Sequence, residues 1–239
     1  MIPDMPARDL LMTTATGQPI EGFAASGDEA LSWWQRLREE YPQTGLWPLL
    51  MEQTTPSELT KHRYGYRTAE QEAVSVLDGA VLLASRGEDR LSIYGTDLAQ
   101  EIQAELRGEG VWREQGDPPG FGLATESGPV TVALVPVVSP WQVPLALHYG
   151  GWNEYPTPSE HAAILRYFHT SYGAELVAIT ATTAEFAVGR PPANRLDAVQ
   201  LAWEYRNYND GEYDLYFADT LTDLAASLLG TTVWRAWWD

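Results

Sequence analysis

Histidine and glutamate side chains gather around one loop, in the segment HYGGWNEYPTPSEH that begins at His148 and ends at His161. His148, Glu154 and His161 are of the types that bind zinc, and the loop could bring them together by folding back. Nothing in their spacing requires a metal. His169 follows His161 by eight residues on the same predicted helix, so the two lie roughly 12 Å apart along its axis, too far to bind one metal ion. We therefore expect no metal and no other cofactor.

Glu154 and His161 are also the pair that could act as general base and acid if the protein were an enzyme. Glu154 precedes a predicted helix, and His161 lies in the first turn of that helix. The partial positive charge at a helix N-terminus favours a carboxylate and disfavours an imidazolium. Glu154 would then be a weak base, and His161 would be neutral. The alternative role of His161 is a hydrogen bond to the loop backbone. The chain has no G-x-S-x-G, phosphate-binding loop, H-E-x-x-H or dinucleotide motif, so we expect no catalytic residues.

Two segments are candidate binding surfaces. The first is the loop with its helix start, where the candidates are Trp152, Asn153, Glu154 and His161. Its alternative is a tight turn whose tryptophan fills the core and whose asparagine caps a backbone group. The second is the acidic run after the next helix, with candidates Tyr208, Asp210, Glu212, Tyr213 and Asp214. Its spacing does not match a calcium loop, so a protein-binding surface or a solvated loop are the alternatives.

The helix that follows the loop has clear ends. Thr157 and Glu160 form a T-x-x-E capping box, Pro158 fits the first helical position, and Gly173 can close the C-terminus. Apolar residues recur at three- and four-residue spacing between them, which predicts a helix over 158–172. The next segments predict strands over 174–180 and 183–188, a helix over 194–206, a short helix over 221–229 and a strand over 231–238. A buried strand over 130–138 precedes them.

This order predicts an α+β fold, with a C-terminal split βαβ, ferredoxin-like unit that contains an inserted short helix. We expect a flexible arm over 1–21, a helix-rich N-terminal region over 22–125 and the α+β domain over 126–239. Within the N-terminal region the patterns predict five elements. The first two are a helix from the Ser26–Glu29 capping box to about residue 40 and a strand over 45–51, whose Pro48 favours a sheet edge or an irregular entry into the strand. The others are a helix from the Thr68 cap to residue 82, a strand over 91–94 and a helix that begins at Thr96.

Four blocks of the C-terminal part resemble one known family. They are GGWNEYP, EHAAILRYFHTSYGAELV, RPPANRLDAVQLA and LAASLLGTTVWRAWWD, and together they resemble the domain of unknown function 4253 family over about residues 130–239. Tyr155 stands where the resemblance leads us to expect a cysteine, and 207–219 departs from the expected pattern. Since that family has no established activity, the resemblance supports the boundary of a domain rather than a function.

The charge of the chain limits its partners. The 239 residues carry a formal charge of −18, with one lysine, Lys61, among 15 basic residues and with no cysteine. Nucleic acid and anionic membranes require many basic side chains, so we expect neither as a partner. The sequence shows no signal peptide and no membrane-spanning run, which predicts a cytoplasmic protein.

We therefore expect a non-catalytic acidic interaction protein, of the antidote or adaptor type, that binds a basic protein. The alternative is a small-molecule-binding protein or hydrolase with its site between Trp152 and His161, and the oligomeric state stays open.

Overall fold

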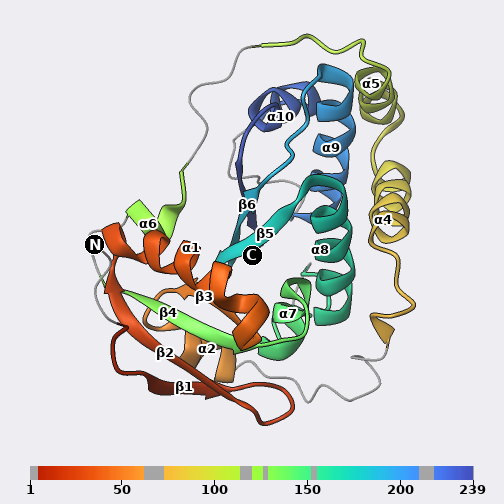
Figure 1. Ribbon diagram of the computed structural model, residues 1–239. Helices are drawn as coiled ribbons and strands as arrows, with labels where there is room; N and C mark the ends of the chain where they lie inside the picture. The colour runs from red at the N-terminus through yellow and green to blue at the C-terminus, as the bar shows by residue number, and fades with distance from the viewer. Residues whose placement is uncertain are drawn as a thin grey trace.

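A seven-stranded mixed sheet runs through the whole molecule in the computed structural model, which describes residues 5–61, 73–113, 120–125, 129–151, 155–209 and 218–238 (Figure 1). The strand order is β1-β2-β4-β3-β5-β6-β7. The strands are β1 (Asp9–Thr13), β2 (Pro19–Ser26), β3 (Leu46–Met51), β4 (Pro129–Pro136), β5 (Ala174–Ile179), β6 (Thr183–Val188) and β7 (Val233–Trp237). All described neighbours are antiparallel except β3 and β5, which are parallel.

Helices cover both faces of this sheet. On one face α1 (Gly27–Thr44) packs on β2, β3 and β4, and the short α6 (Gly122–Thr125) packs beside it. On the other face lie α7 (Val143–Leu147), α8 (Pro158–Tyr172) and α9 (Arg195–Tyr208). An outer layer of α4 (Gly79–Ile93), α5 (Thr96–Leu106) and α10 (Leu221–Leu228) packs on α8 and α9. The remaining elements are α2 (Thr55–Lys61), which contacts β1, and the 3₁₀ turn η1 (Pro140–Gln142) before α7.

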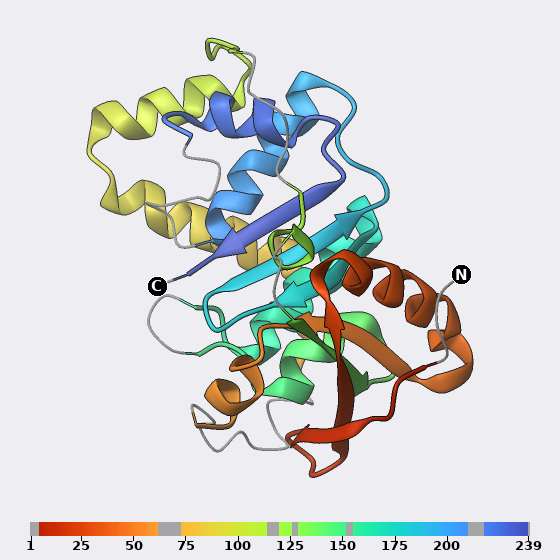
Figure 2. The same ribbon diagram turned by 90° about the vertical axis from the view of Figure 1, so that its left-hand side faces the viewer.

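The C-terminal elements follow the sequence patterns closely. The α8 helix has the predicted bounds, and its capping box is formed in both directions between Thr157 and Glu160. Gly173 ends it in the left-handed conformation, with φ 63°. The hairpin β5–β6, the helix α9 with its Asn194 cap, the helix α10 and the last strand also match their predictions to within a few residues. Figure 2 shows β5, β6 and β7 side by side, in cyan to blue.

The mixed α+β class is confirmed, but the ferredoxin-like arrangement is not found. In that arrangement the first strand of the unit would pair with the third, whereas β4 pairs with β2 and β3, and β6 pairs with β5 and β7. The physical reason is that β3, from the N-terminal half, lies between β4 and β5. The predicted regions 22–125 and 126–239 therefore share one sheet and one core.

Pro48 was expected to favour either a sheet edge or an irregular entry into the strand, and the edge position is wrong because β3 lies near the middle of the sheet. Its ladder with β4 runs from Leu46 to Met51, while its parallel ladder with β5 includes only Leu50 and Met51. Pro48 precedes that short parallel ladder, so the missing N–H breaks no hydrogen bond to β5. The adjacent Trp47 contributes a side-chain bond instead, because its indole N–H donates to the Leu176 carbonyl of β5 at 3.0 Å.

Three expectations for the N-terminal half are wrong. The flexible arm expected over 1–21 is not found in its described part, because β1 and the start of β2 lie within it and pair as antiparallel strands at one edge of the sheet. The segment 91–94 is not a strand, because α4 continues to Ile93. The helix expected from Thr68 to residue 82 is not continuous over its described part, because residues 74–76 form a turn and α4 begins at Gly79, where the Asp78 carboxylate accepts hydrogen bonds from two backbone N–H groups. Thr68 itself lies outside the described residues. No described helix has the length and apolar character needed to cross a bilayer.

Candidate functional site

The two predicted binding segments meet at one hydrogen bond. His161, in the first turn of α8, and Tyr208, the last residue of α9, are joined by a contact of 2.9 Å between the imidazole Nδ1 and the phenol oxygen. Both side chains are buried, His161 completely. The remaining predicted binding residues, Trp152, Asn153, Glu154, Asp210, Glu212, Tyr213 and Asp214, lie outside the described residues.

Aromatic rings enclose the His161 side chain. Tyr149 and Trp238 lie with their ring centroids 5.2 Å from that of the imidazole, and Tyr208 lies at 5.5 Å. Trp238 is held in turn, since its indole N–H donates to the Tyr208 carbonyl at 2.9 Å. The Tyr155 hydroxyl donates to the Trp238 carbonyl at 3.2 Å, so the residue that replaces the expected cysteine is part of this packing. These contacts favour a structural role for His161.

Burial lowers the pKa of His161 well below its usual value of 6.5, and the positive charge of Arg86 acts in the same direction. The imidazole is therefore neutral at pH 7, as the sequence predicted. Its Nε2 has no hydrogen-bond partner among the residues that the structure describes. A Cβ atom added to Gly150 would lie 2.9 Å from this nitrogen, so backbone fills the space in front of it. Among the described residues, the Tyr208 hydroxyl therefore occupies the position at Nδ1, and the Gly150 backbone occupies the space beside Nε2.

A charged pair that the sequence analysis missed lies on the opposite face of the sheet. Glu185 of β6 is only 2% exposed, and its Oε1 accepts a hydrogen bond from the Gly122 N–H at 2.7 Å. Arg235 of β7 lies beside it, with 2.9 Å between its Nε and the same oxygen. The second carboxylate oxygen, Oε2, has no hydrogen-bond partner within the described part of the chain. Burial raises the pKa of the Glu185 carboxyl, although the backbone N–H groups of Gly122 and Leu123 and the guanidinium of Arg235 all oppose this effect.

This pair lines a small cavity at the ends of the parallel strands β3 and β5. The cavity has a volume of about 160 Å³. Its wall combines two carboxylates, one guanidinium, three threonines and an apolar side. The lining residues are Glu52, Gly122, Leu123, Ala178, Ile179, Thr180, Thr182, Thr183, Glu185 and Arg235. One signal in the sequence could have pointed to it, because Glu185 is a charged residue inside the otherwise apolar strand TAEFAV.

A larger cavity of about 640 Å³ lies between the turn joining β1 to β2, the end of α1 and the segment after β4. Its lining has no acidic, basic or histidine side chain. Tyr41 is its one phenol, and that hydroxyl donates to the Val137 carbonyl at 3.1 Å. Although this cavity is larger, its lining residues therefore offer no charged side chain to bind a charged ligand and no histidine or carboxylate to transfer a proton.

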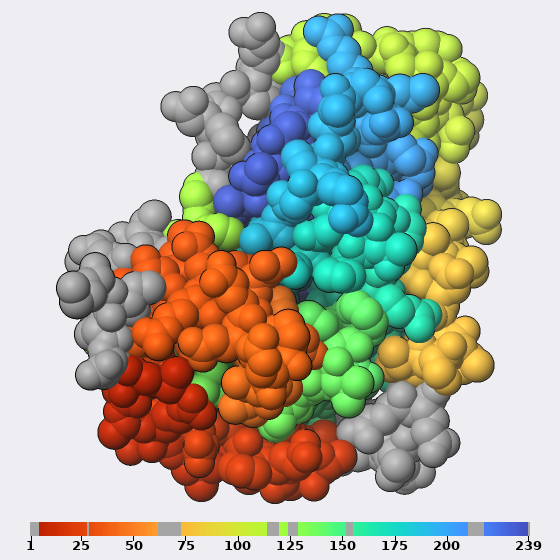
Figure 3. Space-filling model, in the orientation of Figure 1, coloured from red at the N-terminus to blue at the C-terminus, as the bar shows by residue number. Residues whose placement is uncertain are grey.

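The outer layer presents unpaired acidic groups. Glu88 and Asp89 of α4, and Asp97 and Glu101 of α5, are exposed, and none forms an ion pair with another described residue. Exposed apolar side chains lie on the same two helices, namely Val81, Leu98 and Ile93, the last of them 81% exposed. We call these seven residues the α4–α5 surface. In Figure 3 the two helices, coloured yellow to yellow-green, form one rim of the molecule.

The α4–α5 surface lies beside the start of the predicted acidic segment. Arg90 of α4 donates a hydrogen bond to the carbonyl oxygen of Asn209 at 3.1 Å. Asn209 immediately follows α9, and Asp210 is the next residue in the sequence. The chain therefore enters the segment that contains Asp210, Glu212 and Asp214 next to the C-terminal half of α4.

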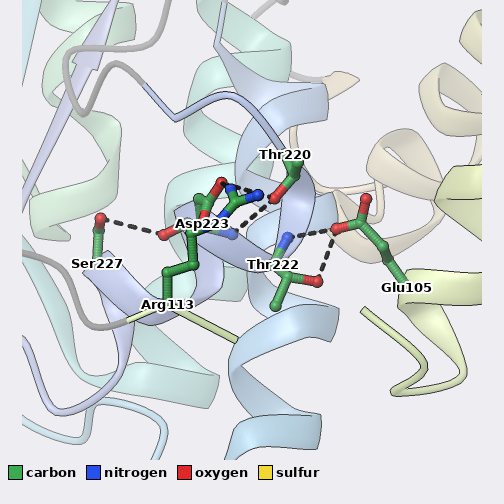
Figure 4. A network of polar contacts seen from close by, with 6 residues as sticks. All are labelled: Glu105, Arg113, Thr220, Thr222, Asp223 and Ser227. Carbon is green, nitrogen blue, oxygen red and sulfur yellow. Dashed lines mark hydrogen bonds and ion pairs between the residues drawn. The ribbon is translucent and has the colours of Figure 1, made fainter. Parts of the chain in front are cut away.

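A polar network joins α10 to α5 and to Arg113 (Figure 4). The buried Glu105 of α5 accepts hydrogen bonds from the Thr222 backbone N–H and from the Thr222 hydroxyl, the latter at 2.7 Å. Arg113 pairs with Asp223 at 2.7 Å, and the Asp223 carboxylate also accepts a bond from the Thr220 hydroxyl. The carboxylates of Glu105 and Asp223 therefore bind residues of the first turn of α10 and Arg113. This network has a structural role, because it joins α10 to α5. Across the described ranges, no three histidine or acidic side chains cluster closely enough to hold a metal ion.

One comparison with known proteins gives a match, and it covers the C-terminal part of the chain. Residues 131–239 match the family model described as a domain of unknown function (DUF4253), which confirms the resemblance over the C-terminal part of the chain. The matched region begins in β4 and contains α8, α9, α10 and the Glu185–Arg235 pair, but it lacks β3. No curated protein and no solved structure matches the chain.

Proposed function

We propose that this protein is a non-catalytic acidic interaction protein, and that the α4–α5 surface binds a basic protein partner. The observation that carries the proposal is that four carboxylates on this surface have no ion-pair partner in the described chain and lie on the same two helices as three exposed apolar side chains. Carboxylates that are already paired would first have to give up an internal partner. Those of the α4–α5 surface can pair directly with arginine or lysine side chains.

The partner that fits is a basic surface or helix with apolar side chains between its charges. Opposite charges speed the encounter and orient it, while Val81, Ile93 and Leu98 supply apolar area that can be buried. The formal charge of −18 strengthens the attraction at long range and disfavours nucleic acid as the partner. Tyr208 is buried, so the predicted contribution of the acidic segment rests on Asp210, Glu212, Tyr213 and Asp214. The proposal retains the cytoplasmic location expected from the sequence.

The test compares two variants with the same change in net charge. One variant carries Glu88→Gln, Asp89→Asn, Asp97→Asn and Glu101→Gln. The control carries Asp9→Asn, Glu21→Gln, Glu29→Gln and Glu39→Gln, which are exposed positions on β1, β2 and α1. A basic protein captured from the native extract by the unmodified protein should associate at least about tenfold more slowly with the first variant, and this difference should shrink in high salt. Equal rates for the two variants would contradict a role for this surface.

The alternative function, a small-molecule site or hydrolase between Trp152 and His161, receives less support. His161 is buried among aromatic rings and neutral, and Gly150 occupies the space before its Nε2. Glu154, the other predicted catalytic residue, lies outside the described residues. Replacing Glu154 with Gln and assaying general hydrolase substrates tests this alternative directly, since a turnover that disappears with the carboxylate would favour it.

A further inference from the structure

We propose that the cavity of about 640 Å³ between the β1–β2 turn, the end of α1 and the segment after β4 binds a small uncharged sugar. Its volume lies within the range of about 300–1,000 Å³ that is usual for small-molecule sites. None of its lining residues belongs to α4 or α5, so the site is separate from the α4–α5 surface and does not rest on the proposed function.

Hydrogen bonds hold the walls of this cavity in place. In the β1–β2 turn, the Thr14 N–H donates to the Gln18 carbonyl at 2.7 Å, and the Gln18 N–H donates to the Thr14 hydroxyl oxygen at 3.0 Å. The Ala15 N–H of the same turn donates to the Ala146 carbonyl of α7 at 3.0 Å. The Tyr41 hydroxyl joins the end of α1 to the segment after β4. These bonds preorganise the three segments, which lowers the cost of binding a ligand between them.

The lining offers hydrogen-bond donors and acceptors that carry no charge. Gln18 is exposed, and its side-chain amide forms no hydrogen bond with another described residue, so both its donor and its acceptor are available. The Gln142 amide oxygen accepts from the Ser139 N–H at 3.0 Å, which orients that amide and leaves its nitrogen as a donor. The Thr16 hydroxyl lies 3.1 Å from that of Thr14 and can accept a further bond. A ligand in the cavity can therefore both donate to and accept from neutral groups.

These groups favour a sugar over other small molecules. An ion would lose water in the cavity without meeting an opposite charge, which is costly. A wholly apolar molecule would cover the two glutamine amides without replacing their hydrogen bonds to water. A planar aromatic molecule would find one ring among the described lining residues, that of Tyr41, and could not stack on both of its faces. A sugar instead presents hydroxyl groups that donate and accept, together with a C–H face that can pack on Tyr41 and Val137.

The probes are D-glucose, D-galactose and D-mannose, titrated into the full chain. Binding is followed through the NMR signals of the Ala15 and Val137 backbone N–H groups, which belong to the wall of the cavity. Glucuronate and cyclohexanol are the charged and the apolar counterparts with a six-membered ring. We expect at least one hexose to saturate these shifts, glucuronate to bind at least about tenfold more weakly because its charge is uncompensated, and cyclohexanol not to saturate.

A pair of glutamine variants tests the position of the site. Gln18→Ala removes an exposed amide and should leave the fold intact, because the backbone bonds of residue 18 remain. It should weaken hexose binding about three- to tenfold, as expected for one lost hydrogen bond. Gln35→Ala removes an exposed amide of α1 outside the cavity and should leave the affinity unchanged. The proposal is overturned if none of the three hexoses saturates, if glucuronate or cyclohexanol binds as tightly, or if the two variants have equal effects.

Discussion

His161 makes the stability of the fold depend on pH. Its native-state pKa is lowered well below 6.5, so between that lowered value and pH 6.5 the unfolded chain binds a proton that the native protein does not. The stabilisation is complete above pH 6.5 and is lost as the pH falls below it, at up to about 1.4 kcal/mol per pH unit. Urea unfolding at pH 7.5, 6.0 and 5.0 should show this decline in the wild type, and a flatter profile in His161→Gln.

Other groups titrate over the same range, so a second histidine variant serves as the control. His169→Gln, at the far end of α8, should keep the wild-type pH profile, because His169 is not enclosed by the aromatic rings around His161. Parallel profiles for the wild type and His161→Gln would show that the neutral, buried imidazole does not govern the acid response.

Gly150 provides a second residue-scale prediction. Its φ of +104° is a conformation that side chains rarely adopt, and an added Cβ would lie 2.6 Å from His161 Cδ2 and closer still to the Pro156 carbonyl oxygen. Gly17 has a φ of +84° but open space around it. We expect Gly17→Ala to cost about 1–2 kcal/mol from backbone strain alone. Gly150→Ala should cost about 1–3 kcal/mol more because of the overlap, as measured by urea unfolding. Equal losses would mean that the backbone near His161 moves aside easily.

At the scale of elements, the two predicted capping boxes differ in a measurable way. Thr157 accepts a hydrogen bond from the Glu160 N–H, whereas Ser26 begins α1 without a side-chain capping bond. Thr157→Ala should therefore lower the free energy of unfolding by about 1 kcal/mol, within a range of about 0.5–2 kcal/mol. Ser26→Ala should change it by only a few tenths. A larger loss for Ser26→Ala would indicate that its hydroxyl caps α1 in solution.

The same comparison shows what local patterns could predict. Caps, apolar spacing and glycine stops act within a few residues, so they located α8, α9, α10 and the β5–β6 hairpin well. Leu91–Tyr94 was misassigned as a strand because four residues cannot distinguish strand from helix, and α4 gains its stability by packing on α8 and α9. The Glu185–Arg235 pair was missed for a related reason, since only the pairing of β6 with β7 brings the two residues together.

At the scale of the whole molecule, the strand order was beyond the reach of these patterns. The pairing of β3 with both β4 and β5 joins residues that are far apart in the sequence, and no local propensity specifies such a contact. The predicted boundary near residue 125 followed the order of the predicted elements and the family resemblance. The structure instead places β3 inside the region that the family model matches, as the link between its first two strands.

This topology predicts that residues 126–239 do not fold alone. Without β3, the strands β4 and β5 have no common neighbour, and the apolar residues that pack against Trp47, Leu49 and Leu50 become exposed. The isolated fragment should lack a cooperative urea transition and should bind a hydrophobic dye, whereas the full chain should unfold in one step. Co-expression with residues 1–125 should restore a cooperative transition by supplying β3. A monomeric 126–239 fragment that unfolds cooperatively on its own would contradict the central role of this strand.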